Sequence, residues 1–123
     1  MQKGYNAYQQ NNTMVESSEK LVTMLYEGIL KFTGLAKRAM LNKDYEKKSY
    51  YISRTSDIYV ELIASLDMKG GEIAEYLYGL YNYQLTLLAE ANITNDVAKF
   101  DEALNVASVL IEAWKEETCA TVA

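Results

Sequence analysis

The stretch VAKFDEALNVASVLIEAW, residues 97–114, repeats apolar side chains at intervals of three and four positions. An α-helix turns once every 3.6 residues, so this spacing gathers the apolar side chains on one helical face. That face is made of Val97, Phe100, Leu104, Ala107, Ile111 and Trp114. Charged residues lie between them and are expected to face solvent. The stretch therefore predicts an amphipathic helix that needs other helices to cover its apolar side.

Three further segments repeat apolar residues at the same spacing. They run from about Ser18 to Leu41, from about Asp44 to Leu66, and from about Glu72 to Asn92. Their predicted packing faces are Leu21, Leu25, Gly28, Phe32, Leu35 and Ala39; then Ile52, Thr55, Tyr59, Leu62 and Leu66; then Ile73, Leu77, Leu80, Gln84, Leu87 and Ala91. The chain contains no proline, so the strongest helix breaker interrupts none of the four segments.

The predicted helix ends rest on residues that can satisfy unpaired backbone groups. Ser17 and Asp44 are expected to cap the first two helices with their side-chain oxygens, and Thr94 or Asn95 the fourth. Asn92 is expected to end the third helix in the left-handed conformation.

Connections of a few residues force neighbouring helices to run antiparallel. The sequence thus predicts an all-α, up-down-up-down four-helix bundle over residues 17–118. Residues 1–16 are expected to form a short N-terminal arm or helix outside it. The last helix is expected to end near Glu117, leaving a frayed tail over residues 119–123.

Composition argues against catalysis and metal binding. Histidine, the commonest general base and metal ligand, is absent. No glycine-rich phosphate loop is present, and the single cysteine, Cys119, is expected to be inert and unable to staple the domain. No catalytic residue, cofactor or metal site is therefore expected. Without a signal sequence or a membrane-spanning apolar run, a cytoplasmic protein without stable membrane insertion is expected.

The charge distribution argues against nucleic acid as a partner. The net charge is −5, and residues 62–123 carry ten acidic and three basic side chains. Basic residues cluster only around the first inter-helix turn, where they are expected to complement a helix dipole. They are Lys37, Arg38, Lys43, Lys47 and Lys48.

The helices carry more apolar surface than a four-helix bundle needs. Beside its predicted packing face, the first helix has a second stripe that includes Tyr26 and Ile29, and the third helix has another that includes Tyr81. The chain has eleven tyrosines and only two phenylalanines, and tyrosine suits surfaces that are wet when free and buried when bound. The predicted binding groove consists of Tyr26, Ile29, Tyr76, Tyr78, Tyr81, Tyr83, Leu85 and Leu88.

Several motifs, in order along the chain, resemble the FliS family of flagellar secretion chaperones. They are Gly4-Tyr5-Asn6-Ala7-Tyr8, Met24-Leu25-Tyr26-Glu27-Gly28, Lys69-Gly70-Gly71-Glu72-Ile73-Ala74-Glu75, Leu80-Tyr81-Asn82-Tyr83, Ala91-Asn92, Asn95-Asp96 and Ala113-Trp114-Lys115. The resemblance runs from Gly4 to Lys115. Ser18 stands where the family usually has proline, which is helpful but not required at a first helical position.

The resemblance implies a chaperone that binds the disordered C-terminal segment of flagellin and prevents its premature polymerisation. It also implies delivery to the flagellar type III export gate, with Tyr5, Ala7 and Tyr8 of the arm as the docking residues. A co-chaperone or regulator is a further implied partner. The alternative from the residues alone is a structural or regulatory bundle that self-associates through its tyrosine-rich face.

Overall fold

The computed structural model describes the backbone of residues 2–122 and the side chains of residues 18–117. It contains the helices α1 (Gln2–Leu41), α2 (Tyr45–Ser65), α3 (Glu72–Thr94) and α4 (Val97–Val122). A short 3₁₀ helix, η1 (Met68–Gly70), lies between α2 and α3 and was not predicted. The predicted all-α fold is confirmed.

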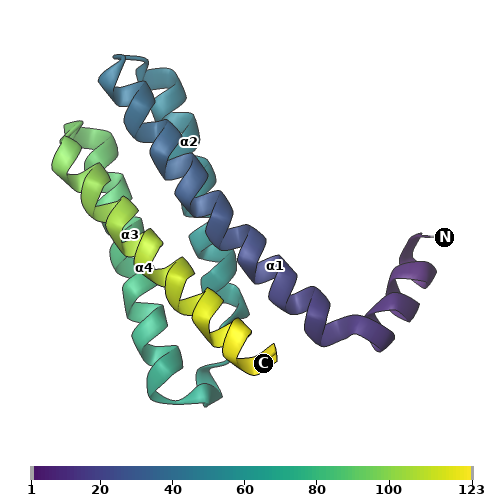
Figure 1. Ribbon diagram of the computed structural model, residues 1–123. Coiled ribbons are helices and arrows are strands. Elements are labelled where there is room, and N and C mark those ends of the chain that lie inside the picture. Colours follow the sequence, from purple (N-terminus) through teal and green to yellow (C-terminus); the bar gives the residue numbers. More distant parts are fainter. Residues whose placement is uncertain (1, 123) are drawn as a thin grey trace.

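The four long helices form an antiparallel bundle (Figure 1). Each helix packs against its neighbour along the chain, and α4 closes the arrangement by packing against α1. Helices α1 and α3 therefore face each other across one diagonal of the bundle, and α2 and α4 across the other. The α1–α2 face and the α3–α4 face are opposite sides of the molecule.

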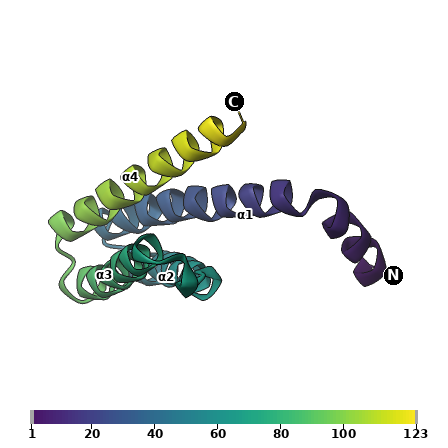
Figure 2. The same ribbon diagram turned by 90° about the horizontal axis from the view of Figure 1, so that it is seen from below.

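Helix α1 begins well before the predicted position. It starts at Gln2 and continues through Ser17 and Ser18, so the predicted cap at Ser17 is wrong. Residues 5–17 contain neither glycine nor proline, and nothing in them stops a helix. The N-terminal part of α1 bends and projects away from the bundle (Figures 1 and 2). The side chains of Tyr5, Ala7 and Tyr8 lie outside the described residues.

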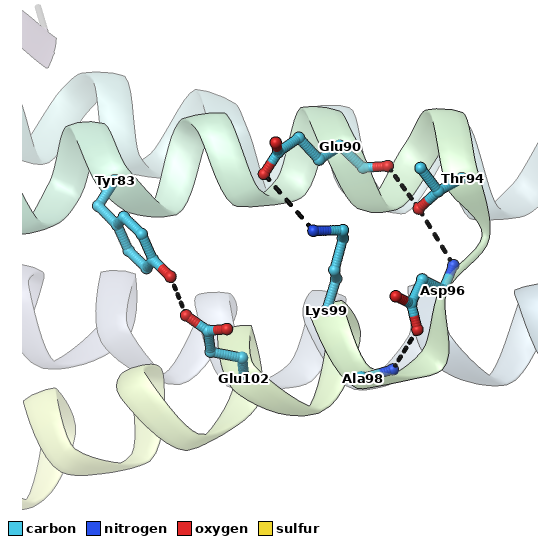
Figure 3. Close-up of polar contacts among 7 residues, drawn as sticks. All are labelled: Tyr83, Glu90, Thr94, Asp96, Ala98, Lys99 and Glu102. Carbon is cyan, nitrogen blue, oxygen red and sulfur yellow. Dashed lines mark hydrogen bonds and ion pairs between the residues drawn. The ribbon is translucent and has the colours of Figure 1, made fainter.

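The other helix ends agree with the predictions in part. Asp44 caps α2, accepting a hydrogen bond from the Lys47 amide at 3.2 Å. Helix α3 ends at Thr94 and not at Asn92, and Asn95 after it adopts the left-handed conformation. Asp96, not Thr94 or Asn95, caps α4 by accepting from the Ala98 amide at 3.0 Å (Figure 3). Helix α4 then continues to Val122 instead of ending near Glu117.

The buried face of α2 matches the predicted one, that of α4 matches it in part, and that of α1 does not. In α4 the predicted Phe100, Ala107 and Ile111 are buried, but Val97 is exposed. The buried residues of α1 are Tyr26, Ile29, Thr33, Ala36, Ala39 and Met40. Leu21, assigned to the packing face, is exposed. Helix α1 must contact both α2 and α4, so the stripe between them is buried. Leu21, Leu25, Gly28 and Phe32 of the predicted stripe instead line a groove shared with α2. In α3, residues of both stripes are buried and Ile73 is exposed.

Candidate functional site

Polar contacts hold α3 and α4 together near the turn that joins them (Figure 3). The Tyr83 hydroxyl donates to the Glu102 carboxylate. Further along, the Lys99 ammonium lies 3.8 Å from the Glu90 carboxylate. The hydrogen bond to Glu102 raises the pKa of Tyr83, because the carboxylate stabilises the protonated phenol. The two helices are thus fixed together at this end.

At the opposite end the same two helices separate. Helix α4 runs away from α3 towards its C-terminal end (Figure 2). It packs more extensively against α1 than against α3. The Trp114 indole N–H donates to Thr23 Oγ1 at 2.7 Å, which ties this part of α4 to α1. A groove of about 520 Å³ is left between α3 and α4. It is lined by Glu72, Ile73, Tyr76, Leu77, Leu80, Val109, Leu110 and Ala113.

The groove presents large apolar side chains to solvent. Ile73 is 74% exposed, Tyr76 is 68% exposed and Val109 is 59% exposed. Fully burying one such side chain stabilises a complex by about 1.5–3 kcal/mol. Contiguous exposed apolar surface of this kind is typical of protein-binding sites. The groove is therefore the candidate functional site.

A network of buried polar contacts lies in the core of the bundle. The hydroxyls of Tyr26 and Tyr81 contact each other, and Gln84 Nε2 donates to the Tyr59 hydroxyl at 2.9 Å. Gln84 Nε2 also donates to the Ala103 carbonyl at 3.1 Å, which links α3 to α4. Burial raises the pKa of Tyr59 to about 12, because a buried phenolate is poorly solvated. These contacts connect all four helices in the core.

The structure corrects half of the predicted groove. Tyr26, Ile29, Tyr81 and Leu88 are buried in the core and offer no surface to a partner. They fill the interior because each lies on the side of its helix that faces the bundle axis. Leu85 is half-buried against the core.

The three remaining tyrosines of the predicted groove are exposed. Tyr76 lines the groove, while Tyr83 lies beyond it at the contact with Glu102. Tyr78 lines neither this groove nor the second one described below.

Most of the groove residues were missed from the sequence. Periodicity predicts Ile73, Leu77 and Leu80 on the packing face of α3, and it places neither Val109 nor Ala113 on a packing face. No local signal in α4 pointed to them, because Val109 and Ala113 lie on the side of the helix roughly opposite its predicted apolar face.

A second, more polar groove lies on the opposite side of the bundle, between α1 and α2. Its volume is about 420 Å³. The α1 side includes the exposed Leu21 and Met24, and the α2 side includes Arg54, Asp57 and Glu61. The Arg54 guanidinium lies 5.3 Å from the centre of the Phe32 ring.

Neither a metal cluster nor a membrane helix is found in the described part of the chain. Residues 18–117 contain no group of three or more acidic, histidine or cysteine side chains placed to hold a metal ion. No helix over the described residues is long and apolar enough to cross a membrane. The side chain of Cys119 lies outside this part.

The family model for the flagellar protein FliS matches residues 1–121. The chain belongs to the FliS family. It is 50% identical over 113 residues to the flagellar secretion chaperone FliS of Campylobacter jejuni, covering 91% of this chain and 88% of the relative. It is 34% identical to the flagellar secretion chaperone FliS of Bacillus subtilis, covering 94% and 86%. The family supports a role as a flagellar export chaperone.

A solved structure confirms the fold independently of close sequence similarity. The crystal structure of a bacterial flagellar chaperone superimposes with a TM-score of 0.78, over 95% of this chain and 96% of the other. Its sequence is 18% identical, so the likeness concerns the fold alone.

Proposed function

We propose that this FliS-family protein binds the disordered C-terminal segment of flagellin in the cytoplasm. It prevents premature polymerisation and brings flagellin to the flagellar type III export gate, by binding and not by catalysis. The observation that carries the proposal is the solvent-exposed apolar groove between α3 and α4. A disordered partner can fold into a helix on such a surface.

The spacing of apolar side chains along the groove suits an amphipathic helix. Ile73, Tyr76 and Leu80 of α3 follow one another at helical spacing along one wall, and Val109 and Ala113 form the other. A helix with apolar side chains at positions i, i+3, i+4 and i+7 would place them between these walls. Tyr78, Tyr83 and Leu85, which lie outside the groove lining, remain proposed contacts for flanking parts of the segment.

The N-terminal part of α1 is proposed to dock on the export gate. It is a helix whose backbone projects from the bundle, so a partner could reach it while the groove is occupied (Figure 1). Tyr5, Ala7 and Tyr8 are the proposed docking residues. Deleting residues 1–16 should leave binding of the flagellin segment intact and abolish capture of the export gate protein.

The groove is tested by introducing a charge at its wall. In Val109→Arg the guanidinium would have to be desolvated under the bound segment, so affinity for full-length flagellin should fall by at least about tenfold. Val60→Arg is the matched control, since Val60 is 55% exposed on α2 and lines neither groove. Calorimetric titration with intact flagellin and with flagellin lacking its C-terminal segment measures both effects.

Three outcomes would contradict the proposal. One is equal binding of the two variants, and another is equal binding of intact and truncated flagellin. The third is a stable homodimer of the free protein in light scattering that is disrupted by Val109→Arg, which would favour self-association through this groove.

A further inference from the structure

The acidic side chains of α3 and α4 fall into two groups according to their partners. Residues 72–117 hold nine acidic and two basic side chains. Near the α3–α4 turn, Glu90 pairs with Lys99, Glu102 accepts from Tyr83, and Asp101 lies 2.6 Å from the Lys37 ammonium (Figure 3 shows the first two). These three carboxylates near the α3–α4 turn are therefore paired with side chains of the protein itself.

Two carboxylates at the open end of the groove, Glu72 and Glu116, have no such partners among the described residues. Glu72 is exposed and lines the groove directly, four residues before Tyr76 on the same face of α3. Glu116 is exposed and continues the face of α4 that carries Val109 and Ala113. Within residues 18–117, neither Glu72 nor Glu116 forms an ion pair, and the groove lining includes no basic side chain.

The antiparallel arrangement places both carboxylates at the same end of the groove. Glu72 is the first residue of α3, and Glu116 lies in the part of α4 that is most separated from α3. An apolar helix entering the groove would bring its own end next to two unneutralised negative charges. A cation there would be attracted, whereas a carboxylate would be repelled.

We infer that the segment held in the α3–α4 groove carries a lysine or arginine at one end of its apolar stretch, paired with Glu72 at the mouth of the groove. This charge pair fixes which way the segment lies, because only one orientation brings the cation to the acidic end. The inference rests on the proposed function and adds the charge pattern and the direction of the bound segment.

Glu72 also has a structural role that the test must separate from binding. A carboxylate in the first turn of α3 stabilises the helix through its dipole, and Glu75 lies in the same turn. Glu75 is exposed and does not line the groove. The variants Glu72→Gln and Glu75→Gln therefore remove the same helix stabilisation, while only the first changes the groove.

The experiment titrates the C-terminal segment of flagellin from the same organism against the wild type, Glu72→Gln, Glu75→Gln and Val109→Arg. Affinity should fall about three- to tenfold in Glu72→Gln and remain unchanged in Glu75→Gln. In about 1 M salt, where the screening length is roughly 3 Å, the effect of Glu72→Gln should largely disappear. Among segment variants with single lysine or arginine residues changed to glutamine, one should lose its sensitivity to Glu72→Gln.

The outcomes distinguish this inference from the proposed function. Equal affinities for Glu72→Gln and Glu75→Gln, together with a loss in Val109→Arg, overturn the charge pairing and leave the groove assignment standing. Sensitivity to Glu72→Gln that persists in every segment variant also overturns it. No binding to the wild type, or full binding to Val109→Arg, overturns the proposed function and the inference with it.

Discussion

The hydroxyl groups of Tyr26 and Tyr81 lie 2.5 Å apart in the core and join α1 to α3 across the diagonal of the bundle. Tyr81 is only 2% exposed, so little water can replace a lost partner. In Tyr26→Phe the Tyr81 hydroxyl would be left buried and unpaired, at a cost of about 1–3 kcal/mol in the free energy of unfolding. Urea denaturation measures this cost.

The double variant is the control for this hydrogen bond. Removing both hydroxyls leaves no unpaired group, so Tyr26→Phe/Tyr81→Phe should be less destabilised than the sum of the single variants. Additive effects would show that the two hydroxyls do not depend on each other.

The same tyrosines predict loss of stability at alkaline pH. Burial raises the pKa of Tyr59 to about 12 and also raises the pKa of Tyr26 and Tyr81. Unfolded tyrosine ionises near pH 10, so the contribution of Tyr59 is fully present below pH 10 and is lost between about pH 10 and 12. Tyr59 contributes about 3 kcal/mol to the free energy of unfolding in this way.

Parallel measurement of tyrosinate absorbance and circular dichroism tests this expectation. Part of the absorbance from the eleven tyrosines should appear only as the helical signal is lost. Ionisation of all eleven with the helical signal unchanged would contradict it.

Lys48 is expected to stabilise the end of α3. It is 4% exposed, and its ammonium donates to the Asn92 carbonyl at 2.7 Å and to Asn95 Oδ1 at 2.6 Å. Lys48→Met keeps the apolar stem but removes both charged hydrogen bonds, which should cost about 1.5–3 kcal/mol of unfolding free energy. Lys47→Met, at an exposed position, should change the unfolding free energy by less than about 0.5 kcal/mol. A similar cost for the two variants would rule out this capping role.

Gly79 offers a stabilising substitution in α3. A methyl group built at this position meets no atom within 4 Å. Because glycine is a poor helix former, Gly79→Ala should raise the free energy of unfolding by about 0.5–1 kcal/mol. At Gly28 the added methyl would lie 3.0 Å from Ile58 Cδ1, so Gly28→Ala should gain less. Thermal unfolding of the two variants compares them, and a larger gain at Gly28 would contradict the expectation.

Local signals in the sequence predicted the bundle well, because helix periodicity and short connections depend on neighbouring residues. The side-chain cap at Asp44 and the buried face of α2 follow from such local rules. The start of α1 was wrong for a related reason: Ser17 can cap a helix, but nothing forces the helix to begin there when the preceding residues are also compatible with it.

The site depended on information that no local pattern contains. Leu77 and Leu80 have the spacing of a packing face, yet they line an open groove. The reason is that the hydrogen bond from Trp114 to Thr23 holds this part of α4 against α1, away from α3. Lys48 contacts the end of α3 only because the α1–α2 turn and the α3–α4 turn lie at the same end of the bundle.

The sequence by itself therefore determined four antiparallel helices and an excess of apolar surface. Only the tertiary structure decided which part of that apolar surface is covered by neighbouring helices. In α1 and α3 the apolar arc is wider than one packing face, so periodicity allows more than one rotation of each helix. The neighbours on both sides select among these rotations, burying Tyr26 and Tyr81 and leaving Ile73 and Tyr76 in solvent.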